Sequence, residues 1–336
     1  MPHPQNCPEL LSSLENIKTL QKQFDSSLSD SIKSGDFTIP QKLKQELEAK
    51  IKELNNKLYP LENLEQENLE QQYSKQLEIL SSSGILETLS TKELGIKIGN
   101  KEYPMPTLDS ILERLRNNSE QLDKKASQGF SKLLVVPFGL DIATLVDKYK
   151  QVLLKHHQNQ TFLDSEGKTL DLDTNQSVWT WDGYQNEPLV YFPQRFDENN
   201  HQGKTKDQLE PWQVLLVEDM IDLPKAGEGK TLNSRKQLDA NQTPNSYLEQ
   251  ILNNQEQGLT PESWLLLAIT YLEEQNKQID DYQGKGKASY LPGAYFPNSA
   301  FVQFAVWNRG AQRAVLDGYR ADFSGSNLAV RSSVKI

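Results

Sequence analysis

Two short fragments of the chain carry the glycine, lysine and threonine that end a phosphate-binding loop. Gly229-Lys230-Thr231 follows the apolar segment VLLVEDM, and Gly203-Lys204-Thr205 occurs earlier in the chain. A loop of the form GxxxxGK[ST] also needs a first glycine, which lets the backbone curl around the phosphates. Pro224 and Glu198 stand at that position in the two fragments, so neither fragment predicts nucleotide hydrolysis.

Histidine and cysteine, which often act as bases, nucleophiles and metal ligands, are scarce. Cys7 is the single cysteine, and this excludes an intrachain disulfide and a zinc site built from several cysteines. His156 and His157 are adjacent at the end of an expected helix, where neighbouring side chains point in different directions. No Ser-His-Asp or Cys-His arrangement stands out in the sequence. We therefore expect no catalytic residues and no cofactor.

Carboxylates gather in a loop around Gly167, at Asp164, Glu166, Asp171 and Asp173. Their spacing misses the EF-hand pattern, which requires oxygen ligands at alternate positions and a terminal glutamate. The sequence therefore predicts no metal site, with a weak calcium site in this loop as the alternative.

Two tryptophans lie in the expected strand SVWTWDGY. Trp179 and Trp181 occupy alternate positions, so both side chains point to the same side of the strand, and we expect them to pack in a core. An enzyme or nucleotide-binding protein remains an alternative function. It would use a pocket near these two tryptophans and the Gly229-Lys230-Thr231 loop.

The last stretch of the chain, residues 290–336, has the composition of a recognition surface. Seven aromatic residues fall between Tyr295 and Phe323, with serine, asparagine and glutamine interleaved. From Phe301 onward the sequence contains five lysines and arginines but two aspartates, although the whole chain has a net charge of -10. Rigid aromatic side chains bury large areas at low entropic cost, which suits a binding surface. The alternative is a β-rich core with ordinary turns.

The length, net charge and hydropathy of the chain limit the kind of protein that it can be. A length of 336 residues suits two domains. The net charge of -10 speaks against general nucleic-acid binding, which requires a basic face. Mean hydropathy is -0.67, and no apolar run reaches the roughly 18 residues of a membrane span. The N-terminus lacks the basic and apolar regions of a signal peptide, so we expect a cytoplasmic protein.

Residues 1–128 are predicted to form a helical bundle or coiled coil. Apolar residues recur at three- and four-residue steps over 8–34, where Gly35 and Asp36 stop the pattern. A second helix begins at Pro40 with steps close to a heptad seam, breaks at Pro60 and continues to about Gly84. A small hairpin near 96–103 turns at Gly99-Asn100, and Thr107 caps a further helix to about Lys125.

Residues 129–336 mix strands and helices without regular alternation. LLVVPFGL is an expected strand, a helix follows it, and several short strands come next. Thr243-Pro244 and Thr260-Pro261 each begin a helix, because threonine caps the first turn and proline fits its first position. The expected fold class is therefore α+β.

A family resemblance appears in these residues. The segment LTPESWLLLAITYLEEQNKQIDDYQGKGKASYLPGAYFP and the ending VRSSVKI resemble variable proteins of diversity-generating retroelements, most of all those of small-genome candidate bacterial phyla. The likeness extends over roughly residues 130–336. It implies a C-type-lectin-type fold related to formylglycine-generating enzymes. The enzymatic activity is not implied, because this half of the chain has no cysteine.

The resemblance also implies that mutagenic copying rewrites selected codons of a variable region at about 295–331. Gly293 to Pro297, Trp307, Arg309, Arg313 and Val330-Arg331 match framework positions. Two departures stand at the end of the chain. Ala329 replaces a usual glycine, and Ser332-Ser333 replaces a usual Pro-Ala, so the terminal strand is expected to turn differently.

The positions between the framework residues are the predicted ligand-binding set. They are Phe301, Gln303, Phe304, Val306, Asn308, Gln312, Val315, Asp317, Tyr319, Asp322, Phe323 and Asn327. The resulting hypothesis is a non-enzymatic recognition protein for an unknown macromolecular ligand, with a protein as the leading candidate. The N-terminal helices would form a homo-oligomer or dock a partner. The remaining alternative is a structural coiled-coil adaptor, in which Phe301, Phe304 and Phe323 would all be buried.

Overall fold

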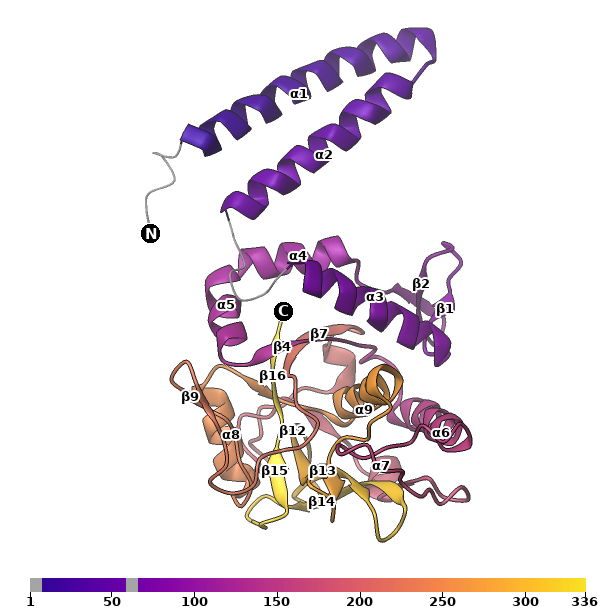
Figure 1. Ribbon diagram of the computed structural model, residues 1–336, viewed down its shortest axis with the longest axis vertical. Helices are drawn as coiled ribbons and strands as arrows, with labels where there is room; N and C mark the ends of the chain where they lie inside the picture. Colours follow the sequence, from indigo (N-terminus) through magenta and orange to yellow (C-terminus); the bar gives the residue numbers. More distant parts are fainter. Residues whose placement is uncertain (1–7, 59–65) are drawn as a thin grey trace. The chain divides into compact units, whose positions relative to one another are not determined.

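The computed structural model describes residues 8–58 and 66–336, which form a mixed α+β protein (Figure 1). N-terminal helices precede a region of helices and several sheets, as predicted. Contacts divide the chain into two compact units, residues 1–62 with 113–120 and residues 63–112 with 121–336. This division differs from the predicted boundary at 128/129. The predicted break at Pro60 lies outside the described residues.

The first unit contains a hairpin of two helices, α1 (Pro8–Ser34) and α2 (Thr38–Leu58) (Figure 1). The prediction for α1 is confirmed, and α2 begins two residues before the predicted proline. The chain reverses at Gly35, whose positive φ of 77° ends α1. Asp36 Oδ1 then accepts hydrogen bonds from the backbone N–H and the hydroxyl of Thr38, at 2.9 and 2.7 Å. The carboxylate therefore satisfies donors at the start of α2.

Only part of the predicted apolar stripe of this hairpin is buried. Leu47 and Leu54, one heptad apart, are buried. Large apolar side chains stay exposed at Leu14, Ile32, Phe37, Ile39 and Ile51. Among the described residues, none of the helices combines the length and the apolar character that crossing a membrane requires.

The second unit includes α3 (Gln66–Ser82), which packs on a strand and a helix that follow it in the chain. Gln72 Oε1 accepts a hydrogen bond from Leu133 N at 2.7 Å, and Gln76 Nε2 donates to Thr270 Oγ1 at 3.0 Å. Because Gln76 is buried, these polar contacts fix the helix to its neighbours. This packing explains why the second unit starts well before residue 129.

A three-stranded antiparallel sheet follows α3, with strands β1 (Glu87–Thr88), β2 (Leu94–Ile98) and β3 (Lys101–Pro104). It confirms the predicted hairpin, which turns at Gly99 with a positive φ of 58°. The predicted cap at Thr107 is also confirmed, since its hydroxyl accepts from Ser110 N at 3.2 Å.

The predicted helix from 107 to about 125 is divided into two. They are α4 (Leu108–Asn117) and α5 (Ser119–Ser127). At the break, the Asn118 side chain donates a hydrogen bond to the carbonyl of Arg114, at 3.1 Å. Asparagine often competes with helical hydrogen bonding in this way, which accounts for the division.

Two larger sheets form the body of the second unit (Figure 1). One is fully antiparallel, in the order β10 (Gln257–Gly258), β16 (Ser332–Lys335), β7 (Gln213–Glu218) and β4 (Phe130–Val136). The other has seven strands, in the main order β15 (Leu328–Val330), β12 (Ala288–Phe296), β13 (Phe301–Asn308), β14 (Arg313–Arg320) and β5 (Val178–Thr180). Off this order, β11 (Asp281–Tyr282) pairs with β13, and β6 (Val190–Tyr191) pairs with β12. A separate short hairpin joins β8 (Thr231–Leu232) and β9 (Arg235–Lys236).

Helices surround these sheets, and one of them is almost completely buried. The helix α9 (Pro261–Gln275) has twelve buried residues among its fifteen, so it is covered on all sides. Such a helix needs partners around its whole circumference. Its Trp264 meets Tyr149 of α6 (Ile142–Gln158) edge to face, with ring centroids 5.9 Å apart. The remaining helical segments are α7 (Gly183–Asn186), α8 (Pro244–Asn253) and the 3-10 helix η2 (Lys206–Gln208).

A buried ion pair lies where the chain passes from one large sheet to the other. Arg331 separates β15 of the seven-stranded sheet from β16 of the four-stranded sheet. Its guanidinium donates to Asp280 Oδ1 at 2.7 Å and to the carbonyl of Met220 at 2.6 Å. Trp264 Nε1 donates to the second oxygen of Asp280, at 2.7 Å. Arg331 and Asp280 are both buried, so each supplies the charge that the other needs.

The first prediction concerns this ion pair. Arg331→Met is expected to lower the free energy of unfolding by about 3–5 kcal/mol, because it leaves a buried carboxylate without its cation. Urea denaturation measures the change. Arg320→Met is the matched control, since Arg320 and its partner Asp322 are exposed, and its effect should stay below about 1 kcal/mol. Similar small effects of both substitutions would contradict a structural role for Arg331.

Candidate functional site

The register of β13 and β14 decides which predicted ligand-binding residues share a face. Phe304 lies directly opposite Asp317, Val302 opposite Tyr319, and Val306 opposite Val315. Residues that face each other in an antiparallel pair project to the same side of the sheet. Phe304, Val306, Val315, Asp317 and Tyr319 therefore occupy one face, and alternate residues of both strands occupy the other.

The other face is buried over most of its length, with the exposed Arg320 at the end of β14 as the exception. Gln303 has no exposed surface, and its Nε2 donates to the carbonyl of Phe301 at 3.2 Å. Phe301 is half-buried against Trp181, with ring centroids 5.2 Å apart. The assignment of Gln303 to the ligand-facing set is therefore corrected, because strand alternation turns it into the core.

Three rings form a continuous aromatic stack on the first face. Phe304 and Tyr319 are parallel, with centroids 4.7 Å apart, and Tyr319 meets Phe323 at 4.6 Å. Exposure rises along the stack, from 7% for Phe304 to 39% for Tyr319 and 44% for Phe323. The hydroxyl of Tyr290 donates to the carbonyl of Phe323 at 2.9 Å, which fixes the loop that carries the last ring. The aromatic stack is therefore a rigid surface with a buried base.

Asp317 lies on the same face, in register with Phe304. It is half-buried, and its Oδ1 accepts a hydrogen bond from Gly318 N at 2.8 Å. Burial raises the pKa of the Asp317 carboxyl, and only this backbone hydrogen bond opposes the effect. Within residues 8–58 and 66–336, we find no lysine or arginine in an ion pair with Asp317. The carboxylate is thus partly desolvated without a compensating cation.

The remaining predicted residues are spread over the sheet and its loops. Asn308 and Gln312 lie at the turn between β13 and β14, where Asn308 Oδ1 accepts from Ala311 N at 3.0 Å. This turn is about 20 Å from Tyr319 along the strand, given a rise of about 3.3 Å per residue. Val306 is buried and Val315 packs at the edge of the same core. Asp322 is exposed, and Asn327 is half-buried.

The structure therefore does not gather the twelve residues into one patch. It brings together Phe304, Asp317, Tyr319 and Phe323. Of the three rings that distinguish a binding surface from an adaptor, Phe323 is exposed, Phe301 is half-buried and Phe304 is buried. Applying strand alternation to β13 would have separated Phe301 and Gln303 from the rest. No pattern in the sequence predicted that Tyr290 would hold the loop of Phe323 by a hydrogen bond.

The acidic loop around Gly167 has a structural partner. Asp164 pairs with Arg309 at 2.6 Å, and Arg309 also binds Asp281 at 2.8 Å. These carboxylates raise the pKa of Arg309, Asp281 most strongly. Although burial alone would raise the pKa of Asp164, the N–H of Lys168 and the Arg309 guanidinium lower it. Among the described residues, no group of three or more His, Cys, Asp or Glu side chains has an arrangement that would hold a metal ion.

A pocket of about 420 Å³ lies beside Trp179, between β5 and α6. It is lined by Lys150, Leu154, Thr174, Asn175, Gln176, Ser177, Val178, Trp179, Thr180 and Asp182. The Gly229-Lys230-Thr231 loop does not line it. That loop leads into β8, and the backbone N–H of Lys230 donates to Gln237 Oε1 at 3.1 Å. The two halves of the predicted enzyme site therefore do not meet in this pocket.

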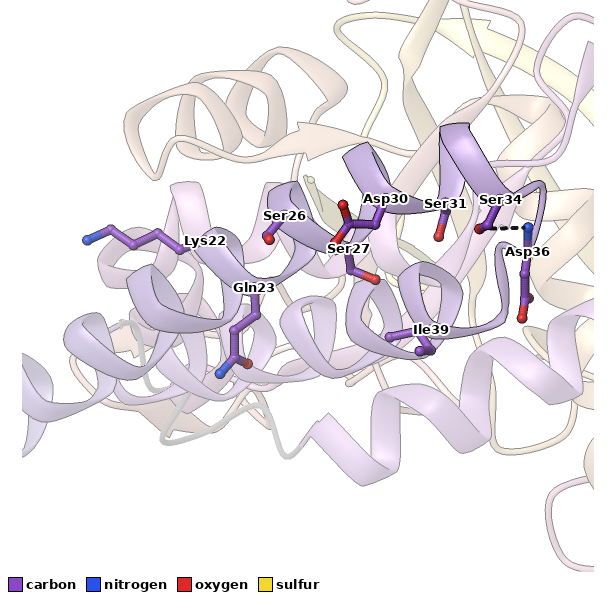
Figure 2. Close-up of a pocket in the computed structure, with 9 residues that line it drawn as sticks. All are labelled: Lys22, Gln23, Ser26, Ser27, Asp30, Ser31, Ser34, Asp36 and Ile39. Atoms are coloured by element: carbon purple, nitrogen blue, oxygen red, sulfur yellow. Dashed lines mark hydrogen bonds between the residues drawn. The ribbon is translucent and has the colours of Figure 1, made fainter.

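A second hollow, of about 520 Å³, lies in the first unit between α1 and the start of α2 (Figure 2). Its lining is mostly serine and charged side chains, namely Lys22, Gln23, Ser26, Ser27, Asp30, Ser31, Ser34, Asp36 and Ile39. Some of these polar groups stabilise the turn between α1 and α2, since Ser34 Oγ accepts a hydrogen bond from Asp36 N at 3.4 Å (Figure 2). The hollow shows no pairing of a nucleophile with a base.

Comparisons with protein-family models, with curated proteins and with solved structures found no match. The aromatic stack with Asp317 is the candidate site that the geometry itself singles out. It combines exposed rings, a buried base and a carboxylate without an internal cation.

The second prediction concerns the pH dependence of stability. Since the pKa of Asp317 is higher in the folded state than in the unfolded chain, its ionisation destabilises the fold as pH rises through that interval. Asp317→Asn is therefore expected to be more stable than the wild type at neutral pH. The difference should vanish below the unfolded pKa of about 3.9, where the carboxyl is protonated in both states. Urea denaturation at several pH values measures this.

The control for this prediction is Glu210→Gln, which also removes one negative charge but at an exposed position. It should leave stability within about 0.5 kcal/mol at every pH. A loss of stability in Asp317→Asn at neutral pH would show that the carboxylate has an internal partner.

Proposed function

We propose that this protein is a non-enzymatic recognition protein that binds a macromolecular ligand, most simply another protein, through the aromatic stack. The observation that carries the proposal is the exposure of Tyr319 and Phe323, which continue a stack based on the buried Phe304. In the described part of the second unit, they are the aromatic side chains among the exposed large hydrophobic residues. Aromatic residues of this kind are the commonest anchors of protein interfaces.

The sheet under the stack supports this function. Tyr319 belongs to β14, which pairs with β13 along its whole length, and Phe323 is held by Tyr290. A binding group on a rigid strand loses little conformational entropy when a ligand binds. The antiparallel β12–β13–β14 arrangement is also compatible with the C-type-lectin-type fold that the sequence resemblance implies.

We also propose that a retroelement diversifies part of this surface. The exposed Gln312, Tyr319, Asp322 and Phe323 can change without disturbing the core, whereas the buried Gln303 cannot. Framework residues have fixed partners. A Cβ on Gly293, for example, would lie 2.3 Å from the carbonyl oxygen of Gly258.

The third prediction follows from diversification. Sequencing of the neighbouring DNA is expected to show a reverse transcriptase gene and a near-repeat of the 3′ coding segment. The repeat should differ from the coding segment mainly at adenines, and the differences should fall in codons of the exposed positions. If the neighbouring DNA contained neither the reverse transcriptase gene nor the near-repeat, diversification would be refuted. The proposal of a binding function would then rest on the aromatic stack alone.

Self-association through α1 and α2 would strengthen weak binding by avidity. The exposed Ile32, Phe37 and Ile39 favour it, because an apolar surface in water gains free energy when a second copy covers it. We therefore propose that two or more copies of the chain associate through this hairpin. Light scattering on the purified protein tests this, since a mass equal to one chain would refute it.

The fourth prediction tests the stack as a binding site. Peptides selected on the wild-type protein from a random-peptide phage library are expected to lose affinity for Tyr319→Ser and for Phe323→Ser. A loss of about 2 kcal/mol for each anchor corresponds to roughly 30-fold. Both variants should keep the fold, because both rings are substantially exposed. Calorimetry and circular dichroism measure affinity and folding.

Leu94→Ser is the matched control for this experiment. Leu94 is 38% exposed on β2, close to the exposure of Tyr319, so its loss removes apolar surface at another place. Peptides that tolerate both stack variants but lose affinity for Trp179→Ser would move the site to the pocket beside α6. Peptides that tolerate all these variants would refute both sites.

A further inference from the structure

The aromatic stack has a charged neighbour that apolar recognition does not use. Asp317 lies two residues before Tyr319 on β14 and directly opposite Phe304 on β13. Positions two apart on a strand project to the same side, about 7 Å from each other. The carboxylate and the ring of Tyr319 therefore border one patch of surface.

We propose that Asp317 and the aromatic stack bind the cationic side chain of a lysine or arginine that projects from a protein partner. The cation would lie over the exposed rings of Tyr319 and Phe323, with its charge turned toward Asp317. This inference rests on the proposed function and specifies the chemistry of its ligand.

The unpaired state of Asp317 supports a cationic ligand. Several buried carboxylates in the described part of the second unit are neutralised from within. Arg331 pairs with Asp280, and Arg235 pairs with both Glu218 and Glu256. Asp317 Oδ1 accepts a hydrogen bond from the backbone N–H of Gly318, and no ion pair joins Asp317 to another described residue. A partly desolvated carboxylate is strongly stabilised by an external cation.

The nearest cation in the sequence does not fill this role. Arg320 is on the same strand, but the alternation of β14 places it on the opposite face from Asp317. Its Nε lies 3.3 Å from Asp322 Oδ1, and both side chains are exposed. Arg320 therefore does not neutralise Asp317.

The rings add a second attraction for the same ligand. The face of an aromatic ring carries negative charge and attracts a cation within about 6 Å of its centroid. Burial and the negative charge of Asp317 both raise the pKa of the Tyr319 phenol, so the carboxylate acts on this ring. The net charge of -10 on the chain attracts basic partners over longer distances.

Other ligand classes fit this surface less well. A neutral apolar side chain on the stack would bury Asp317 further without pairing it, which costs free energy. An acidic ligand would be repelled by the carboxylate. A lysine or arginine satisfies the rings with its methylene chain and the carboxylate with its charge.

The fifth prediction tests this inference directly. The probes are an arginine–glycine peptide and the same peptide with citrulline, which keeps the shape of arginine but has no charge. Titration calorimetry with the full chain is expected to show binding of the arginine peptide and at least about tenfold weaker binding of the citrulline peptide. Asp317→Asn should weaken the arginine peptide by at least about tenfold as well.

Three further variants separate this site from general electrostatic attraction. Glu210→Gln changes the net charge by the same amount as Asp317→Asn, and it should leave affinity within about twofold. Tyr319→Phe keeps an aromatic face and should keep binding, whereas Tyr319→Leu keeps apolar surface alone and should lose it. Because Asp317→Asn is expected to stabilise the fold, its loss of binding would not come from unfolding.

The outcomes distinguish this inference from the proposed function. Equal binding of the two probe peptides, or unchanged affinity in Asp317→Asn, would overturn the cationic site. Library peptides that depend on Tyr319 and Phe323 but carry no lysine or arginine would also overturn it, and the proposed binding surface would survive. If neither library nor arginine peptides depend on Tyr319 and Phe323, both proposals fail.

Discussion

The arrangement of the second unit depends on a buried ion pair in which the guanidinium of Arg331 is the cation. At this residue the chain leaves the seven-stranded sheet and enters the four-stranded sheet. Its hydrogen bonds reach Asp280, just before β11, and the carbonyl of Met220, just after β7. Asp280 in turn holds Trp264 in the buried helix α9. One charge thus fixes the two sheets and the central helix in a common arrangement, because a displaced partner would leave a charge unpaired in a dry interior.

At the candidate site, in contrast, a partly buried charge has no ion-pair partner among the described residues. Asp317 is half-buried without a cation, whereas Arg331, Arg309 and Arg235 each neutralise carboxylates of the framework. The contrast is the one that the proposed binding function predicts. A framework gains stability when its charges are satisfied internally, but a binding surface keeps unsatisfied groups for its ligand and accepts lower stability.

Local signals in the sequence predicted local structure well. Thr243 and Thr260 cap the helices that start beside them, and Gly99 turns the expected hairpin. The break at Asn118 was not predicted, because helical periodicity continues across it. The sequence could not show which residues meet across the sheets, since β11 pairs with β13 and Arg331 finds Asp280 through contacts between distant segments. The sequence prediction included Phe304, Asp317, Tyr319 and Phe323, which the structure brings together. The faces of Phe301 and Gln303 could not be assigned without the register.

The position of β16 in its sheet has a consequence for the synthesis of the protein. β16 lies between β10 and β7, although residues 332–335 are made long after both. As the chain leaves the ribosome, β4 and β7 can pair early, but β10 has no strand to join until Lys335 has emerged. The open edges of β7 and β10 must therefore be protected during translation, because unpaired strand edges attract other chains. When β16 pairs with both strands, neither of these edges stays open.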